Sequence, residues 1–98
     1  MSYLVLCVFG LRNATRDDYL CAYMDLATLG LGKIVKSENG PSFTLPATAV
    51  MGVFEGTSVE DVRSNVGKKV QGIFKARGLS GDFFVVASAD WACAGEST

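Results

Sequence analysis

The first and last apolar segments of the chain are predicted to be strands with apolar side chains on both faces. The first segment is Tyr3 to Phe9, and the last is Asp82 to Ser88. Successive side chains of a strand point to opposite faces of the sheet, so both faces of these strands need apolar neighbours. This requirement constrains the fold more than any other feature, because a chain of 98 residues buries only one modest core.

A helix is predicted to follow the first strand. Thr15 and Asp18 have the spacing of a capping box, and Asp17 adds negative charge to the first turn. Glycine commonly follows the last turn of a helix, so this helix is expected to end at Gly30 or Gly32. Its expected buried face carries Leu20, Tyr23 and Ala27, with Tyr19 and Leu26 beside them.

A second helix is predicted in the second half of the chain. Thr57 and Glu60 have the spacing of another capping box. An apolar stripe at helical spacing follows, formed by Val59, Val62, Val66, Val70 and Ile73. Gly78 is the expected C-terminal cap. Gly67 and Gly72 are unfavourable inside a helix, and we expect them to let the helix lie close to a sheet.

Two further strands are predicted between the helices, at Lys33 to Ser37 and at Thr48 to Glu55. The sequence Asn39-Gly40-Pro41 indicates a turn after the first of them. The segment from Ser42 to Ala47 is interpreted as a linker. It contains Pro46, which excludes it from the centre of a sheet.

The order β-α-β-β-α-β predicts one α+β domain over residues 1–98, with residues 89–98 as a C-terminal tail. The simplest architecture for this order is the ferredoxin-like sandwich, in which two helices cover one face of a four-stranded antiparallel sheet. Right-handed crossovers place the first and third strands in the middle of that sheet.

The second face of this sheet needs a cover of its own, because the two helices shield only one face. The candidates are a second copy of the chain, the tail that carries Trp91, or both. A large aromatic ring just beyond the last strand suits either role, as an anchor over the sheet or in a partner's pocket. Trp91 is therefore a candidate binding residue, and a homodimer is the expected assembly. The alternative is that Trp91 closes the end of its own core.

The composition argues against several classes of function. The chain has no histidine, so the commonest metal ligand and the usual general base are missing. We expect no metal and no cofactor. The three cysteines are Cys7, Cys21 and Cys93; an odd number without close pairs indicates free thiols in the cytoplasm. No segment has the length of a membrane span, so no membrane contact is expected.

Nucleic acid is the less favoured partner. The second helix is basic, and Arg63, Lys68 and Lys69 are its candidate phosphate-contacting residues, followed by Lys75 and Arg77. A basic run of this kind is more often the solvated side of an amphipathic helix. The formal net charge of -1 gives no overall attraction for a polyanion.

The chain resembles a group of small ferredoxin-like bacterial proteins. The group comprises the CRISPR-associated integration subunit with its nuclease relatives, the VapD-like ribonucleases and the GhoS-like antitoxin endoribonuclease. The resemblance lies in the strand that opens at Tyr3, the helix end Leu29-Gly30, the second helix and the strand from Asp82 to Val86. It implies a homodimer and a regulatory or toxin–antitoxin setting. The nuclease members carry an aspartate at the end of the first strand, where this chain has Phe9-Gly10-Leu11, so metal-dependent nuclease activity is not expected.

The residues and the resemblance together favour a small, cytoplasmic, dimeric binding or regulatory module without catalytic activity. The alternative is a small endoribonuclease that acts on RNA with arginine and aspartate side chains and without histidine.

Overall fold

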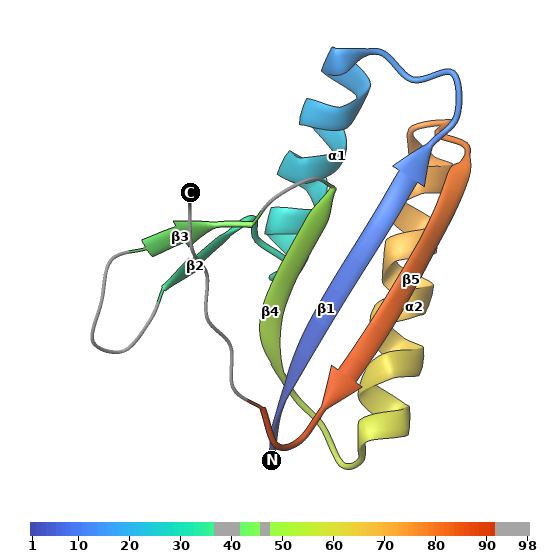
Figure 1. Cartoon of the computed structure of the whole chain (residues 1–98). Coiled ribbons are helices and arrows are strands. Elements are labelled where there is room, and N and C mark those ends of the chain that lie inside the picture. Colours follow the sequence, from blue (N-terminus) through green and yellow to red (C-terminus); the bar gives the residue numbers. More distant parts are fainter. Residues whose placement is uncertain (37–41, 46–47, 92–98) are drawn as a thin grey trace.

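A computed structural model describes residues 1–36, 42–45 and 48–91. The elements follow in the order β1 (Ser2–Leu11), α1 (Arg16–Leu29), β2 (Ile34–Lys36), β3 (Ser42–Thr44), β4 (Ala49–Glu55), α2 (Val59–Ala76) and β5 (Gly81–Ser88). Both helices lie on one side of a sheet made by the long strands (Figure 1). The predicted turn at 39–41 and the tail after Trp91 lie outside the described residues.

The long strands form a three-stranded antiparallel sheet in the order β4-β1-β5. The predicted fourth strand does not join it, so the expectation of a four-stranded sheet is not met by the described residues. Instead, β2 pairs with β3 in a separate two-stranded sheet. The segment predicted as a linker thus contains a strand.

Among the described residues between α1 and β4, one point of contact with the edge of β4 precedes the turn into β2. Gly32 and Met51 exchange two backbone hydrogen bonds, of 2.9 and 2.8 Å. The strand that follows Gly32 then pairs with β3, its nearer neighbour in the sequence. Pairing with the nearer segment closes a shorter loop and costs less chain entropy, which favours a local hairpin over a fourth strand in the large sheet.

Helix α1 begins and ends as the sequence predicts. The Asp18 N–H donates to the Thr15 hydroxyl (3.2 Å), and the Thr15 N–H donates to the Asp18 carboxylate (3.0 Å), which confirms the capping box. After Leu29, Gly30 adopts a left-handed conformation with φ 108°, and the next N–H donates to the Leu26 carbonyl. Glycine adopts this conformation without steric strain.

The predicted buried face of α1 is correct in part: Tyr19, Tyr23 and Leu26 lie in or against the core, but Leu20 and Ala27 do not. Leu20 is 49% exposed and Ala27 is also exposed, whereas Ala22 and Leu26 are fully buried. Apolar residues occur around most of this helix, with Met24 exposed on the outside. Periodicity alone therefore allows more than one orientation. The orientation found places Tyr19 and Tyr23 against Phe9 of β1.

Helix α2 begins one residue later than predicted. Its N-cap is Ser58, whose hydroxyl accepts from the Asp61 N–H (3.1 Å). The predicted box of Thr57 and Glu60 is therefore wrong in register; the hydroxyl of Thr57 bonds the Asp61 carboxylate instead. A serine and an acidic residue occur at the same spacing one position along, which the sequence pattern could not distinguish.

Three residues of the predicted stripe of α2 are buried, Val62, Val66 and Val70, together with Phe74, whereas Val59 and Ile73 are half-buried. The helix ends at Ala76, and Gly78 follows with φ 67°. The role expected for Gly67 and Gly72 is wrong, because a Cβ added at either position would meet nothing within 4 Å. Neither glycine is required for close contact with the sheet.

The core lies entirely between the sheet and the helices. From β1 it takes Tyr3, Val5, Cys7 and Phe9, all at most 5% exposed. The ring of Phe9 contacts that of Phe74, with ring centroids 5.4 Å apart. Within the described residues, no polar or charged residue is buried. In the described part of the chain, neither α1 nor α2 is long and apolar enough to cross a lipid bilayer.

Candidate functional site

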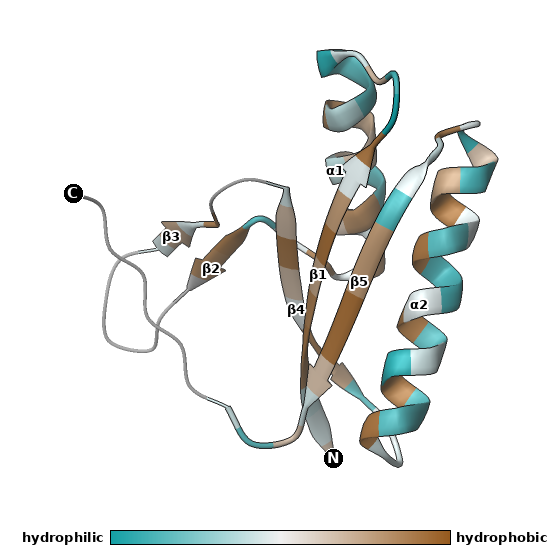
Figure 2. Cartoon of the chain, turned by 45° about the vertical axis from the view of Figure 1, so that its right-hand side comes forward, coloured by the Kyte–Doolittle hydropathy of each residue, from teal (hydrophilic) through white to brown (hydrophobic). Residues whose placement is uncertain are grey.

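The sheet face opposite the helices carries an apolar block, which we call the open face. Strand register arranges it as three cross-strand rows, each with one residue of β4, β1 and β5. The rows are Ala49–Val8–Phe84, Met51–Leu6–Val86 and Val53–Leu4–Ser88. Eight of these nine side chains are apolar. In Figure 2, brown colour runs along β1 and β5 on this part of the sheet.

The open face is accessible to solvent. Phe84 is 65% exposed, Val53 57%, Val86 43% and Val8 40%. These exposed fractions indicate an interaction surface, because an exposed apolar cluster is usually an interaction site. The sequence predicted both faces of β1, β4 and β5 correctly, because the alternation of side chains along a strand is strict.

Polar groups border the open face at both ends. At one end, Asp82 is paired with Gly10 in the register, and the Arg12 guanidinium lies 3.4 Å from its carboxylate. At the other end, the Ser2 hydroxyl donates to the Glu55 carboxylate (2.7 Å). The hydrogen bond from Ser2 is the main cause that lowers the pKa of Glu55 below its usual range. An apolar centre with a polar rim is the usual anatomy of a protein interface.

The β2–β3 hairpin stands beside the open face. It lies on the side of the sheet away from α2, as Figure 2 shows. Its exposed residue Ile34 is 64% accessible. The base of the hairpin is held by Lys33, whose ammonium donates to the Leu45 carbonyl (2.8 Å) and lies 5.0 Å from the centre of the Tyr23 ring. The hairpin therefore adds apolar surface next to the block.

Trp91 is exposed to 45%, directly after the turn that follows β5. It is not one of the buried core residues, so the structure does not support the alternative in which Trp91 closes its own core. The possibility that the tail covers the open face concerns residues 92–98, which lie outside the described part of the chain.

The predicted basic residues do not converge. Arg63, Lys68 and Lys69 are all exposed on α2. At about 100° per residue they lie roughly 100 to 140° apart around the helix axis. No hydrogen bond or ion pair among the described residues joins them. Nucleic-acid contact stays a prediction, because this spread gives no single phosphate-binding groove.

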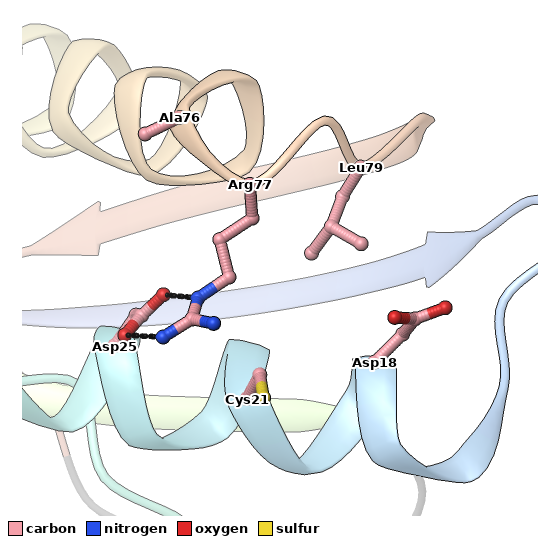
Figure 3. A pocket seen from close by; sticks show the side chains of 6 residues that line it. All are labelled: Asp18, Cys21, Asp25, Ala76, Arg77 and Leu79. Atoms are coloured by element: carbon pink, nitrogen blue, oxygen red, sulfur yellow. Dashed lines mark hydrogen bonds and ion pairs between the residues drawn. The ribbon is translucent and has the colours of Figure 1, made fainter.

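A cavity of about 480 Å³ lies between α1 and the end of α2 (Figure 3). The guanidinium of Arg77 forms two hydrogen bonds with the Asp25 carboxylate, one of them 3.1 Å long. This contact lowers the pKa of Asp25 and raises that of Arg77. Sequence analysis missed the pair, because 52 residues separate its members and neither lies in a motif. The lining also includes Asp18, Cys21, Ala76 and Leu79.

The described residues contain two thiols, Cys7 and Cys21, and the predicted accessible thiol Cys93 lies outside them. Cys7 is fully buried, and burial raises the pKa of its thiol to about 11, which favours the unreactive protonated form. Cys21 is half-buried on α1 and is a free thiol. Within residues 1–36, 42–45 and 48–91, no group of three or more Cys, Asp or Glu side chains could hold a metal ion.

No protein-family model and no curated protein matches the chain.

Proposed function

We propose that the protein is a non-catalytic, ferredoxin-like binding module that self-associates through its open face. The observation that carries this proposal is the three-by-three block of the open face, eight of whose side chains are apolar and whose outer members are up to 65% exposed. The ferredoxin-like assignment is supported by the central place of β1 and by two helices on one face.

A second copy of the chain is the occupant that fits this surface best. The block is apolar, and its charged groups lie at the rim, so a copy of the same surface can cover it without burying unpaired charge. The resemblance to the small ferredoxin-like bacterial proteins named above implies the same assembly, in a regulatory or toxin–antitoxin setting in the cytoplasm.

The size of the block predicts a weak association. Four residue steps along β1 and two strand spacings across the sheet give roughly 13 by 10 Å between Cα atoms. With its side chains the block covers roughly 300 Å², against about 800 Å² per partner in a stable complex. The hairpin carrying Ile34 adds contact area, but we expect the open face alone to give dissociation constants in the micromolar range or weaker.

Sedimentation of two matched variants tests this proposal. Val53→Glu places a charge in the open face on the strand farthest from β5, and Met24→Glu makes the same kind of change on α1, where Met24 is 67% exposed. We expect Val53→Glu to weaken self-association about tenfold or more and Met24→Glu to leave it unchanged. Equal association of Val53→Glu and the unaltered protein would contradict the proposal.

A further inference from the structure

The outer edge of β5 is a second surface without a sheet neighbour. Among the described strands, β5 pairs only with β1, and Figure 1 shows it at the margin of the sheet. Natural sheets protect such edges with proline, lysine, bulges or very short strands. The eight residues of β5 contain neither proline nor lysine, and Asp82 is their only charged residue. Within the described residues, an apolar edge of this length without these devices favours pairing with another strand.

The hydrogen-bonding groups along this edge can be assigned from one contact. The Arg12 N–H donates to the Ser80 carbonyl (2.7 Å), one step beyond the paired residues Leu11 and Gly81. In an antiparallel pair, alternate residues direct both backbone groups to the same neighbour. Asp82, Phe84 and Val86 therefore bond β1. The backbone groups of Phe83, Val85 and Ala87 point outward.

We propose that two copies of the chain join through their β5 edges, antiparallel, about a two-fold axis at Val85. Val85 then faces its own symmetry mate, and their outward N–H and C=O groups bond each other reciprocally. Phe83 and the partner's Ala87 form the next such pair on either side. This register makes about six backbone hydrogen bonds across the axis.

The side chains favour this register over its neighbours. With the axis at Val85, each aromatic ring lies opposite a smaller side chain: Phe84 faces the partner's Val86, and Phe83 faces the partner's Ala87. Asp82 faces the partner's Ser88, so no like charges meet. Moving the axis to Val86 would place Asp82 opposite the partner's Asp90. Like charges directly across two strands are destabilising.

A small residue of α2 lies on the flank of the helix that would face the partner. Helix α2 covers β5, and the rings of Phe74 and Phe83 are in contact at 6.0 Å. Gly67 lies nine positions before Ala76, which is about 180° around the helix. Because Ala76 lines the cavity against α1, Gly67 is on the opposite flank, where a Cβ would meet nothing within 4 Å. The absent side chain lets the α2 helices of two copies approach each other.

Edge pairing also changes the open face. A two-fold axis perpendicular to the sheet keeps both open faces on the same side, so six strands form one continuous sheet. The apolar surface on that side doubles to roughly 600 Å², which is close to the area that one partner contributes to a stable complex. The role of the doubled open face rests on the proposed function, whereas the pairing of the two β5 edges does not depend on it.

A cysteine pair tests the register. Asp82 and the partner's Ser88 form a non-hydrogen-bonded pair with Cα atoms about 4.5 Å apart, which is within disulfide range. In a Cys21→Ser, Cys93→Ser background, the variant with Asp82→Cys and Ser88→Cys should form a covalent dimer on mild oxidation. Either change alone should not, because like residues are then about 20 Å apart across the axis. No covalent dimer from the pair, or equal dimer from a single change, overturns the proposal.

Two further variants separate this proposal from the proposed function. Adding Val53→Glu to the cysteine pair should leave cross-linking unchanged, whether or not the open face takes part in association. Val85→Pro removes an N–H that points away from β1, so the fold should persist, as circular dichroism would show. Self-association at the edge should fall at least tenfold. A folded Val85→Pro protein that cross-links through the cysteine pair as before refutes edge pairing.

Discussion

Gly52 and Gly72 are both glycines inside regular elements, and the structure predicts opposite results when each becomes alanine. At Gly52, in β4, a Cβ would lie 2.0 Å from the Gly30 carbonyl oxygen and 3.1 Å from its carbon. Both atoms are backbone, so neither can rotate away. At Gly72, in α2, a Cβ would meet nothing within 4 Å.

The magnitudes follow from these two environments. An ordinary carbon contact needs about 3.5 Å, so Gly52→Ala must push Gly30 and β4 apart by more than about 1 Å. Overpacking of this kind costs about 1 to 3 kcal/mol. The shift also strains the two hydrogen bonds between Gly32 and Met51, each worth roughly 1 kcal/mol. We expect a loss of about 2 to 4 kcal/mol, against a total stability of roughly 5 to 15 kcal/mol.

Gly72→Ala is expected to stabilise the protein. Alanine in an exposed helix position is better than glycine by about 0.5 to 1 kcal/mol, because less backbone entropy is lost on folding. In a domain of this size that corresponds to a rise of roughly 2 to 8 °C in Tm. Urea unfolding and thermal melts followed by circular dichroism measure both variants. If Gly52→Ala is as stable as the unaltered protein, a Cβ at this position is accommodated against the Gly30 backbone, and the reasoning is refuted.

Three further changes have expected outcomes. Tyr19→Phe should destabilise the fold by about 1 to 3 kcal/mol in urea unfolding. The reason is that the Tyr19 hydroxyl accepts from the Leu11 N–H (3.0 Å) and donates to the Leu11 carbonyl (3.3 Å). An unchanged unfolding midpoint would show that water replaces the hydroxyl. Asp25 has a lowered pKa in the folded state because of its contact with Arg77, so its stabilising contribution is fully present above the unfolded pKa of 3.8 and is lost as pH falls from there through the lower folded pKa. Asp25→Asn should therefore reduce the difference in stability between pH 6 and pH 3, and an unaltered difference contradicts the assignment. Trp91→Ala should cost clearly less than the 3 to 5 kcal/mol of a buried ring, because Trp91 is 45% exposed; a larger loss in a thermal melt would place the ring in the core.

The strands were the most predictable part of the fold. Alternation along a strand has a period of two, so assigning Tyr3 and Val5 to one face assigned Leu4 and Leu6 to the other. The open face could therefore be anticipated in its composition. The capping box of Thr15 was predictable for a similar reason, since both of its bonds lie within four residues.

The errors occurred where distant contacts decide between patterns that are locally equivalent. Leu20 and Leu26 are equally apolar, but only contacts with the sheet select Leu26 for the core. The β2–β3 hairpin depends on a competition between two pairings, which propensity does not describe. The Asp25–Arg77 pair depends on how α1 and α2 pack, and no local signal in the sequence indicates it.

The register of β1 has a consequence for how the chain folds. Both neighbours of β1 come from the second half of the sequence, and Leu4 pairs with Ser88, 84 residues later. During synthesis, this apolar strand leaves the ribosome long before either neighbour exists. Contacts at such separation form slowly because the loop between them must first be closed. We therefore expect the nascent chain to depend on chaperones until β5 has emerged.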